Sequence, residues 1–158
     1  IDIGRHTEMP IHAHRAGWGA LTRDPLLGWS YPAWSKLWRL AGADHMHVNG
    51  FDNKFTESNE SVAASVASLK DPLFGNSPMC AVPVFSSGQT VRQAAATLNA
   101  AGSPDVLVTA GGGIIAHPDG VTEGVKAMRQ AYDAAMQGVD VDVYAKEYHE
   151  LTAALAAF

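Results

Sequence analysis

The sequence predicts an α/β fold in which four parallel strands alternate with helices. Two observations support this prediction: four short apolar runs recur along the 158-residue chain, and segments with helical periodicity lie between them. Markers at the ends of the runs, His14, His47, Ser86 and Gly111, are 33, 39 and 25 residues apart. This spacing suits the βα units of a barrel, so the chain is either a small open α/β sheet or half of a (β/α)8 barrel.

The four apolar runs are the predicted strands. They span residues 10–14, 43–48, 81–85 and 105–110. Pro83 lies inside the third run, and proline cannot donate a hydrogen bond to a neighbouring strand. We therefore expect the paired part of that strand to consist of Val84 and Phe85.

Helices are predicted between the strands and after the last one. The first places Trp34, Leu37 and Trp38 on one face. Glycine or an Asp-Pro pair follows each of the first four helices and predicts where it ends. The predicted helices span residues 32–40, 57–69, 90–101, 120–136 and 143–157.

The composition argues against several classes of function. The net charge is −5 and no cluster of Lys and Arg is present, which argues against a nucleic-acid-binding surface. No apolar run approaches the ~20 residues of a membrane span. The single cysteine, Cys80, excludes an internal disulfide framework and indicates a reducing compartment, so we expect a cytoplasmic protein. Cys80 itself begins an apolar run and is predicted to be a small core residue.

Candidate functional residues gather where the predicted strands end. They are cationic, titratable, hydroxyl-bearing or glycine residues, and comprise His12, His14, Arg15, His45, His47, Lys54, Ser86, Ser87, Gly88 and Gly111 to Gly113. Ligands of α/β folds bind outside the carboxyl ends of the strands, so these residues predict one anion-binding site. Glycines expose backbone N–H groups there, and Arg, Lys and His supply donors for phosphate oxygens.

Each of these signals also has other interpretations. Three glycines in a row can form a plain tight turn, and a His-x-His pair can be two packed histidines held by hydrogen bonds. His12 and His45 would lie one layer deeper than His14 and His47, so we assign the deeper pair to structure. A zinc-dependent hydrolase is a further alternative, because two His-x-His strand ends could bind Zn²⁺.

Taken in this order and at these spacings, HAHRA, DHMH…K, VFSSG and AGGGIIAHPDG resemble strands five to eight of the RuBisCO large-chain barrel. The resemblance covers nearly the whole chain and implies one segment, residues 1–158, forming the C-terminal half of a (β/α)8 TIM barrel. It implies that His14 is a catalytic histidine and that Lys54 is the mobile-loop lysine that stabilises the transition state. It further implies substrate and phosphate contacts at Arg15, His47, Ser86, Gly88, Gly111 and Gly112.

Two departures resemble the non-carboxylating RuBisCO-like proteins rather than the carboxylases. Trp18 stands where carboxylases carry a further histidine, and the loop before Lys54 reads VNGFDN, without their small residue next to the lysine. The chain is most similar to the branch that acts on 3-oxo-isoapionate 4-phosphate. The resemblance implies a decarboxylase that forms a Mg²⁺-stabilised enediolate. A transcarboxylase/hydrolase of the same substrate, and an enolase or isomerase of a methylthio-pentose phosphate, are the alternatives.

The resemblance also implies parts that this chain does not contain. The magnesium site of the family belongs to strand two, so the Mg²⁺ ligands are expected outside these residues and no metal ligand is assigned within them. The N-terminal domain and the first half-barrel are likewise expected outside the chain, which would begin within the helix before strand five. We therefore expect a homodimer or larger assembly and an inactive isolated chain. A half-barrel that only packs against a partner is the non-enzymatic alternative.

Overall fold

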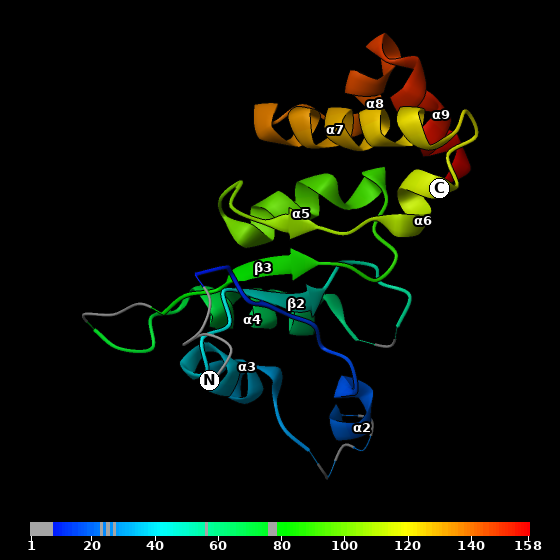
Figure 1. Ribbon diagram of the computed structural model, residues 1–158. Helices are drawn as coiled ribbons and strands as arrows, with labels where there is room; N and C mark the ends of the chain where they lie inside the picture. The colour runs from blue at the N-terminus through cyan, green and yellow to red at the C-terminus, as the bar shows by residue number, and fades with distance from the viewer. Residues whose placement is uncertain (1–7, 23, 25, 27, 56, 76–78) are drawn as a thin grey trace.

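Four parallel strands form a single sheet in the computed structural model, which describes residues 8–22, 24, 26, 28–55, 57–75 and 79–158. The helix expected before the first strand falls on residues 1–7, outside the described residues. The strands pair in chain order (Figure 1), as β1 (His12–Ala13), β2 (His45–Asn49), β3 (Val82–Phe85) and β4 (Leu107–Val108).

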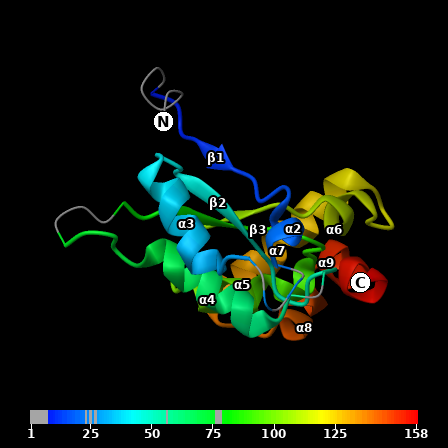
Figure 2. The same ribbon diagram turned by 90° about the horizontal axis from the view of Figure 1, so that it is seen from below.

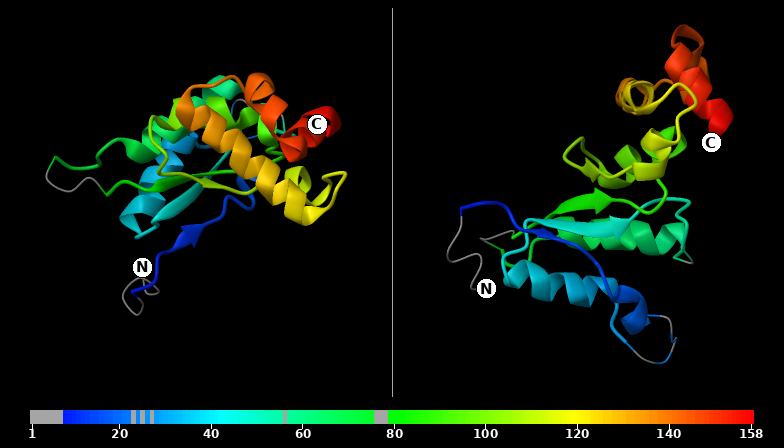
Figure 3. Two further views of the ribbon diagram at one scale, coloured as in Figure 1. Left: turned by 90° about the horizontal axis from the view of Figure 1, so that it is seen from above. Right: turned by 45° about the vertical axis from the view of Figure 1, so that its right-hand side comes forward.

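Helices follow the strands as predicted. They are α2 (Trp18–Thr22), α3 (Tyr31–Leu40), α4 (Asn59–Lys70), η1 (Val91–Gln93), α5 (Ala94–Ala101), α6 (Gly111–Ile115), α7 (Val121–Gln137), α8 (Val141–Tyr144), η2 (Ala145–Glu147) and α9 (His149–Ala157). Figure 2 and the left view of Figure 3 show α3, α4, α5 and α7 on the same side of the sheet. Sequential parallel strands with their helices on one side are the arrangement of consecutive βα units in a barrel. None of the helices in the described ranges is long and apolar enough to span a membrane.

Local signals in the sequence set most helix boundaries. The side chains of Ser30, Ser58 and Thr90 each accept a hydrogen bond from a backbone N–H in the first turn of α3, α4 and η1. Helices α5 and α7 end at Gly102 and Gly138, whose φ angles of 64° and 67° are left-handed. The predicted helix ends are therefore confirmed where a cap or a glycine determines them.

The alternation of side chains along β2 separates the core from the candidate site. Met46 and Val48 are fully buried in a hydrophobic cluster with residues of α3 and α4, and His45 and His47 alternate with them along the strand. A second cluster joins α5, α7 and α9. The core thus holds the sheet against its helices and leaves the histidines on the other face.

Strand β3 is paired with β2 along its whole length, so the prediction that pairing is confined to its last two residues is wrong. The Val82 N–H donates to the Asp44 carbonyl at 2.8 Å. Alternate residues of a parallel strand direct their N–H groups to opposite edges, so the nitrogen of Pro83 is directed toward β4. Because β4 pairs only from Val84 onward, the missing donor of Pro83 breaks no hydrogen bond of the sheet.

Three other local predictions need correction. Gly111 to Gly113 form the first turn of α6, and neither this helix nor α2 was predicted. The last predicted helix is divided into α8, η2 and α9, because Tyr148 adopts an extended conformation (φ −133°, ψ 111°). Cys80 is exposed rather than in the core, and its thiol donates to the Lys70 carbonyl at the end of α4 (3.1 Å).

Candidate functional site

A cleft opens at the carboxyl ends of the four strands. It is lined by residues that follow or end each strand, among them His14, Arg15, His47, Asn49, Lys54, Glu57, Ser86, Ser87 and Thr109. The structure therefore brings together six candidate residues predicted from the sequence, namely His14, Arg15, His47, Lys54, Ser86 and Ser87. Gly88, Gly111 and Gly112, which were predicted with them, are not among the residues that line this cleft.

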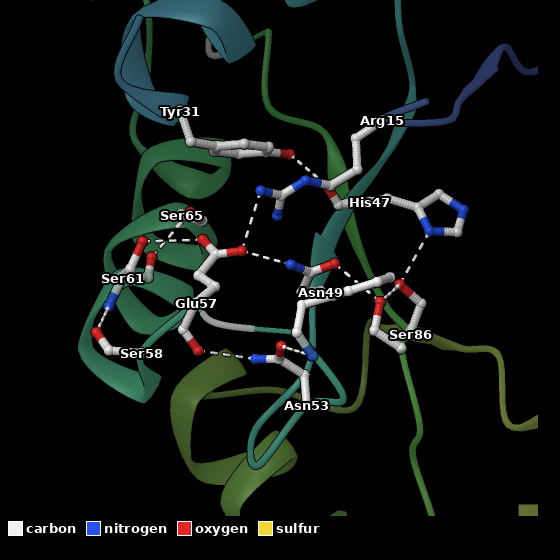
Figure 4. Close-up of polar contacts among 12 residues, drawn as sticks. Arg15, Tyr31, His47, Asn49, Asn53, Glu57, Ser58, Ser61, Ser65 and Ser86 are labelled. Atoms are coloured by element: carbon white, nitrogen blue, oxygen red, sulfur yellow. Dashed lines mark hydrogen bonds and ion pairs between the residues drawn. The ribbon is translucent and has the colours of Figure 1, made fainter. Parts of the chain in front are cut away.

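Arg15 is held in the wall of the cleft. The residue is only 8% exposed, and its guanidinium carbon lies 4.9 Å from the ring centroid of Tyr31 and 5.4 Å from that of Trp18. Nη2 forms an ion pair with Glu57 Oε2 at 3.0 Å (Figure 4). Burial lowers the pKa of Arg15, and the Glu57 carboxylate opposes that shift. Nη1 is shielded from solvent and has no hydrogen-bond partner in the described structure.

Glu57 is the functional residue that the sequence analysis missed. Its Oε2 accepts hydrogen bonds from Arg15 and from Asn49 Nδ2, and its Oε1 accepts from Ser61 Oγ at 2.8 Å. Asn49 Oδ1 in turn accepts from Ser87 Oγ at 2.8 Å. A polar chain of Arg15, Glu57, Asn49 and Ser87 therefore crosses the ends of β1, β2 and β3. The available signal was an acidic residue three positions after Lys54, but the sequence pattern placed it only at the start of the helix predicted over residues 57–69.

Two members of this polar chain have a left-handed backbone. The φ angle is 65° at Asn49 and 71° at Ser87. Such angles are uncommon in residues other than glycine and cost about 1 kcal/mol or more each. The two strained residues are joined through their side chains, which fixes the loop after β3 against the end of β2.

His47 is a buried hydrogen-bonding residue. It is 7% exposed, its Nδ1 lies 3.2 Å from Ser86 Oγ, and its carbonyl accepts the Tyr31 hydroxyl at 2.7 Å. Burial, followed by the neighbouring His14, His12 and Arg15, lowers the pKa of His47 to about 4. His47 is therefore neutral near pH 7 and offers hydrogen bonds rather than charge. Burial also raises the pKa of Tyr31, which keeps its hydroxyl protonated.

The histidines of the first strand lie beside His47. His12 Nε2 is 2.8 Å from His47 Nε2, and the His14 ring centroid is 4.6 Å from that of His47. His12 was assigned to structure, and it contacts the site directly. His14 is exposed at the cleft.

The loop that carries Lys54 is closed at its base. Asn53 Nδ2 donates to the Glu57 carbonyl at 3.0 Å (Figure 4). It also donates to the Gly50 carbonyl at 3.0 Å and so joins the two ends of the loop. The Lys54 N–H donates to the Ser87 carbonyl at 3.0 Å. The loop therefore lies against the segment after β3, and the Lys54 side chain remains exposed.

The segment after β3 is shaped to receive this loop. Gly88 has a left-handed φ of 95°, and a Cβ added there would lie 3.6 Å from Lys54 Cβ. Gln89 is buried and donates from Nε2 to the Phe51 carbonyl at 3.2 Å. Gly88 is thus placed beside Lys54 rather than in the wall of the cleft.

The glycine run after β4 forms a separate region with little side-chain chemistry. A Cβ added at Gly113 would lie 2.4 Å from the Gln89 carbonyl oxygen, so glycine is required there for packing. Gly111 and Gly112 have no such constraint, because nothing lies within 4 Å of a Cβ built on either. Neither has a positive φ angle. Their backbone is therefore exposed without a conformational or packing reason for glycine.

The described residues do not fit a magnesium site. Glu57 is the one carboxylate among those that line the cleft, and both of its oxygens are occupied by Arg15, Asn49 and Ser61. No group of three or more His, Cys, Asp or Glu residues in the described part of the chain is arranged to hold a metal ion.

Comparison with known proteins gives the same family throughout. Residues 2–158 match the model of the ribulose bisphosphate carboxylase large chain, catalytic domain. A 3-oxo-isoapionate-4-phosphate transcarboxylase/hydrolase of Xanthobacter autotrophicus is 56% identical over 154 residues, covering 98% of this chain and 37% of that protein. A 3-oxo-isoapionate-4-phosphate decarboxylase of Rhizobium etli is 41% identical over 157 residues, covering 99% of this chain and 37% of that protein.

A solved structure is similar to this chain in both sequence and fold. The crystal structure of a RuBisCO-like protein from Burkholderia fungorum is 44% identical and superposes with a TM-score of 0.96, covering 99% of this chain and 39% of that protein. The chain therefore spans well under half the length of these relatives. The predicted resemblance and the predicted half-barrel are confirmed, and the chain belongs to the RuBisCO large-chain family.

Proposed function

We propose that the protein carrying this chain cleaves a carbon–carbon bond of 3-oxo-isoapionate 4-phosphate. The observation that supports this proposal is the cleft, where Arg15, His47, Lys54 and Ser86 meet in a chain that is 56% and 41% identical to proteins named for this substrate. The substrate's name specifies one phosphate, one carboxylate and a 3-oxo group. Two anion-binding elements therefore suit it, with the Arg15 region holding one oxyanion and the backbone of Gly88, Gly111 and Gly112 the other.

The charged and titratable residues of the cleft are suited to the steps of this reaction. When a 3-oxo acid loses CO₂, the bond to the carboxyl carbon breaks and its electron pair forms an enolate on the 3-oxo oxygen. The Lys54 ammonium is the charge that would stabilise that oxygen, since it lies on a loop placed at the cleft. His14 would then deliver the proton that the enolate carbon takes up.

Neutral hydrogen-bonding groups complete the proposed binding site. His47 and Ser86 would hold substrate oxygens while remaining uncharged. The family resemblance also implies Mg²⁺, which would act as a Lewis acid on the enolate. We place its ligands outside this chain, where the resemblance implies them, since the described residues do not fit the metal.

The transcarboxylase/hydrolase is the second candidate, and the 56% identity to a protein of that name favours it. Both activities need the same stabilisation of a developing oxyanion.

We also propose a dimer or larger assembly. Solved relatives that are 33% and 32% identical are described as octameric in Pyrococcus horikoshii and dimeric in Hyperthermus butylicus.

The test uses the protein expressed with its complete native sequence. We expect it to consume 3-oxo-isoapionate 4-phosphate, which can be followed by phosphorus NMR, and to leave ribulose 1,5-bisphosphate unchanged. Stoichiometric release of CO₂ identifies the decarboxylase, and cleavage without free CO₂ identifies the transcarboxylase/hydrolase. Turnover of ribulose 1,5-bisphosphate with no reaction of the proposed substrate would show that the proposal is wrong.

A further inference from the structure

Glu57 occupies the centre of the site without being one of its predicted ligands. Its side chain is 15% exposed, and it lies between the Lys54 loop and the first turn of α4. Partners from separate parts of the chain converge on it, namely Arg15 after β1, Asn49 at the end of β2 and Ser61 in α4. Figure 4 shows these three side chains directed at its carboxylate.

The hydrogen bonds of Glu57 have a specific pattern of donors. Arg15 and Asn49 both donate to Oε2, and these donors cannot become acceptors. Ser61 donates to Oε1, and its hydroxyl can rotate to accept instead. A glutamine at position 57 can therefore keep all three hydrogen bonds, with its oxygen in place of Oε2 and its nitrogen donating to Ser61. This substitution removes only the charge.

The contacts of Glu57 determine how Arg15 faces the cleft. Nη2 is held by the carboxylate, and Nη1 is left as a buried donor without a partner in the described residues. A buried donor that lacks a partner is costly, so the site is more stable when an oxyanion reaches Nη1. Nη1 is shielded from solvent, which means that the cleft wall has to shift slightly as the anion binds.

The same residue is tied to the Lys54 loop. The Glu57 carbonyl accepts from Asn53, the neighbour of Lys54, while its carboxylate holds Asn49, which precedes the loop. One residue thus fixes the arginine of the site and both ends of the loop that carries the lysine.

We propose that Glu57 is a positioning residue: by hydrogen bonding it orients Arg15 toward a substrate oxyanion and holds the base of the Lys54 loop. The identity of that oxyanion as a sugar-acid phosphate rests on the proposed function. The positioning itself does not, because any phosphate can report it.

The experiment measures inorganic phosphate binding by calorimetry to the complete native protein. The Arg15→Met variant defines the part of the binding that depends on Arg15. We expect Glu57→Ala to weaken that part at least about tenfold and Glu57→Gln to stay within about threefold of the wild type. Glu60→Gln and Glu60→Ala are the matched controls, because Glu60 is an exposed glutamate in the first turn of α4, close to Glu57 in the sequence, and should leave binding unchanged.

Two further measurements keep the proposal testable. If Glu57→Ala does not fold, as judged by its thermal melt, Ser61→Ala removes one hydrogen bond of Glu57 from an exposed position and should weaken binding by about threefold. In the active enzyme, Glu57→Ala should raise KM more than it lowers kcat.

The opposite results are equally specific. The proposal is overturned if Glu57→Gln binds phosphate as weakly as Glu57→Ala, since charge would then matter rather than position. It is also overturned if Glu57→Gln binds more than about threefold more tightly than the wild type, or if Glu57→Ala binds as well as the wild type. Normal phosphate binding with no turnover of the sugar acid would contradict the proposed function and leave the role of Glu57 intact.

Discussion

The two ends of the site bind, in our proposal, by opposite means. At the ends of β1 and β2, the buried side chains of Arg15, Asn49 and His47 and the partly buried side chain of Glu57 form a dense polar set. At the end of β4, Gly111 and Gly112 present bare backbone with open space around it. We call the first region the side-chain end and the second the glycine end. The side-chain end depends on polar side chains that are present, and the glycine end depends on the absence of side chains at Gly111 and Gly112. We therefore expect mutations that remove a side chain to impair the side-chain end, and mutations that add a side chain to impair the glycine end.

The largest effect is expected at Lys54, whose loop lies against the segment after β3. In the complete enzyme, Lys54→Ala should lower kcat by about 10²–10³-fold with only a small rise in KM, because the lost charge acts on the developing oxyanion. Steady-state kinetics with the phosphorylated substrate checks this, and the exposed Lys36→Ala in α3 is the control. A mutant that loses only ground-state affinity would contradict the assignment.

At the side-chain end, Arg15→Met should lower the free energy of unfolding by roughly 3 kcal/mol, because it leaves the Glu57 carboxylate without its cation in a partly buried site. The double variant Arg15→Met/Glu57→Gln should regain much of that free energy of unfolding. Chemical denaturation of the four proteins gives the coupling energy. Additive losses would show that the two residues act independently.

The side-chain end should also be sensitive to pH. The pKa of His47 is lowered from 6.5 to about 4, so the unfolded chain takes up a proton at a pH where the folded chain does not. The contribution of His47 is complete above pH ~6.5 and is lost as the pH falls toward 4, by on the order of 2 kcal/mol. Unfolding curves across this range, compared with those of His47→Gln, measure it. Parallel curves for the two proteins would refute the expectation.

The smallest effects are expected at the glycine end, where neighbouring positions should separate binding from packing. Gly111→Val should weaken binding of a phosphate-ester inhibitor by about tenfold with little change in stability, because its side chain would enter open space. Gly113→Ala should instead destabilise the fold by about 2 kcal/mol, since its Cβ would meet the Gln89 carbonyl. Equal inhibitor affinity of wild type and Gly111→Val would remove Gly111 from the site.

Signals confined to a few neighbouring residues made most of the fold predictable. Serine caps before α3 and α4, and Gly102 and Gly138 after α5 and α7, determine backbone conformation locally. Helix α6 was missed because its sequence GGGII has poor helix propensity, and its glycine Gly113 is required by contact with a distant loop. The pairing of Pro83 depended on which neighbour its nitrogen faces, which only the assembled sheet decides.

The candidate site likewise contains residues that local sequence signals could predict and one residue that they could not. Arg15, His47 and Lys54 stand at strand ends or in the loop beyond, and parallel strands bring such residues together. Glu57 could not be found in this way, because its importance comes from its side-chain contacts, above all the ion pair with Arg15, which is distant in the sequence. The sequence identifies residues by type and place, but a carboxylate that serves other side chains is recognised only from its contacts.

The left-handed backbone at Asn49 and Ser87 has a consequence for engineering. Glycine would relieve the strain at both positions, but Asn49→Gly and Ser87→Gly would each remove the hydrogen bond that joins the two side chains and would give the unfolded chain more conformational freedom. Each replacement would also cut the hydrogen-bond path between Arg15 and the segment that supports Lys54. Relief of backbone strain alone is therefore a poor guide to improving this protein, and these two positions are ones to hold fixed when it is engineered.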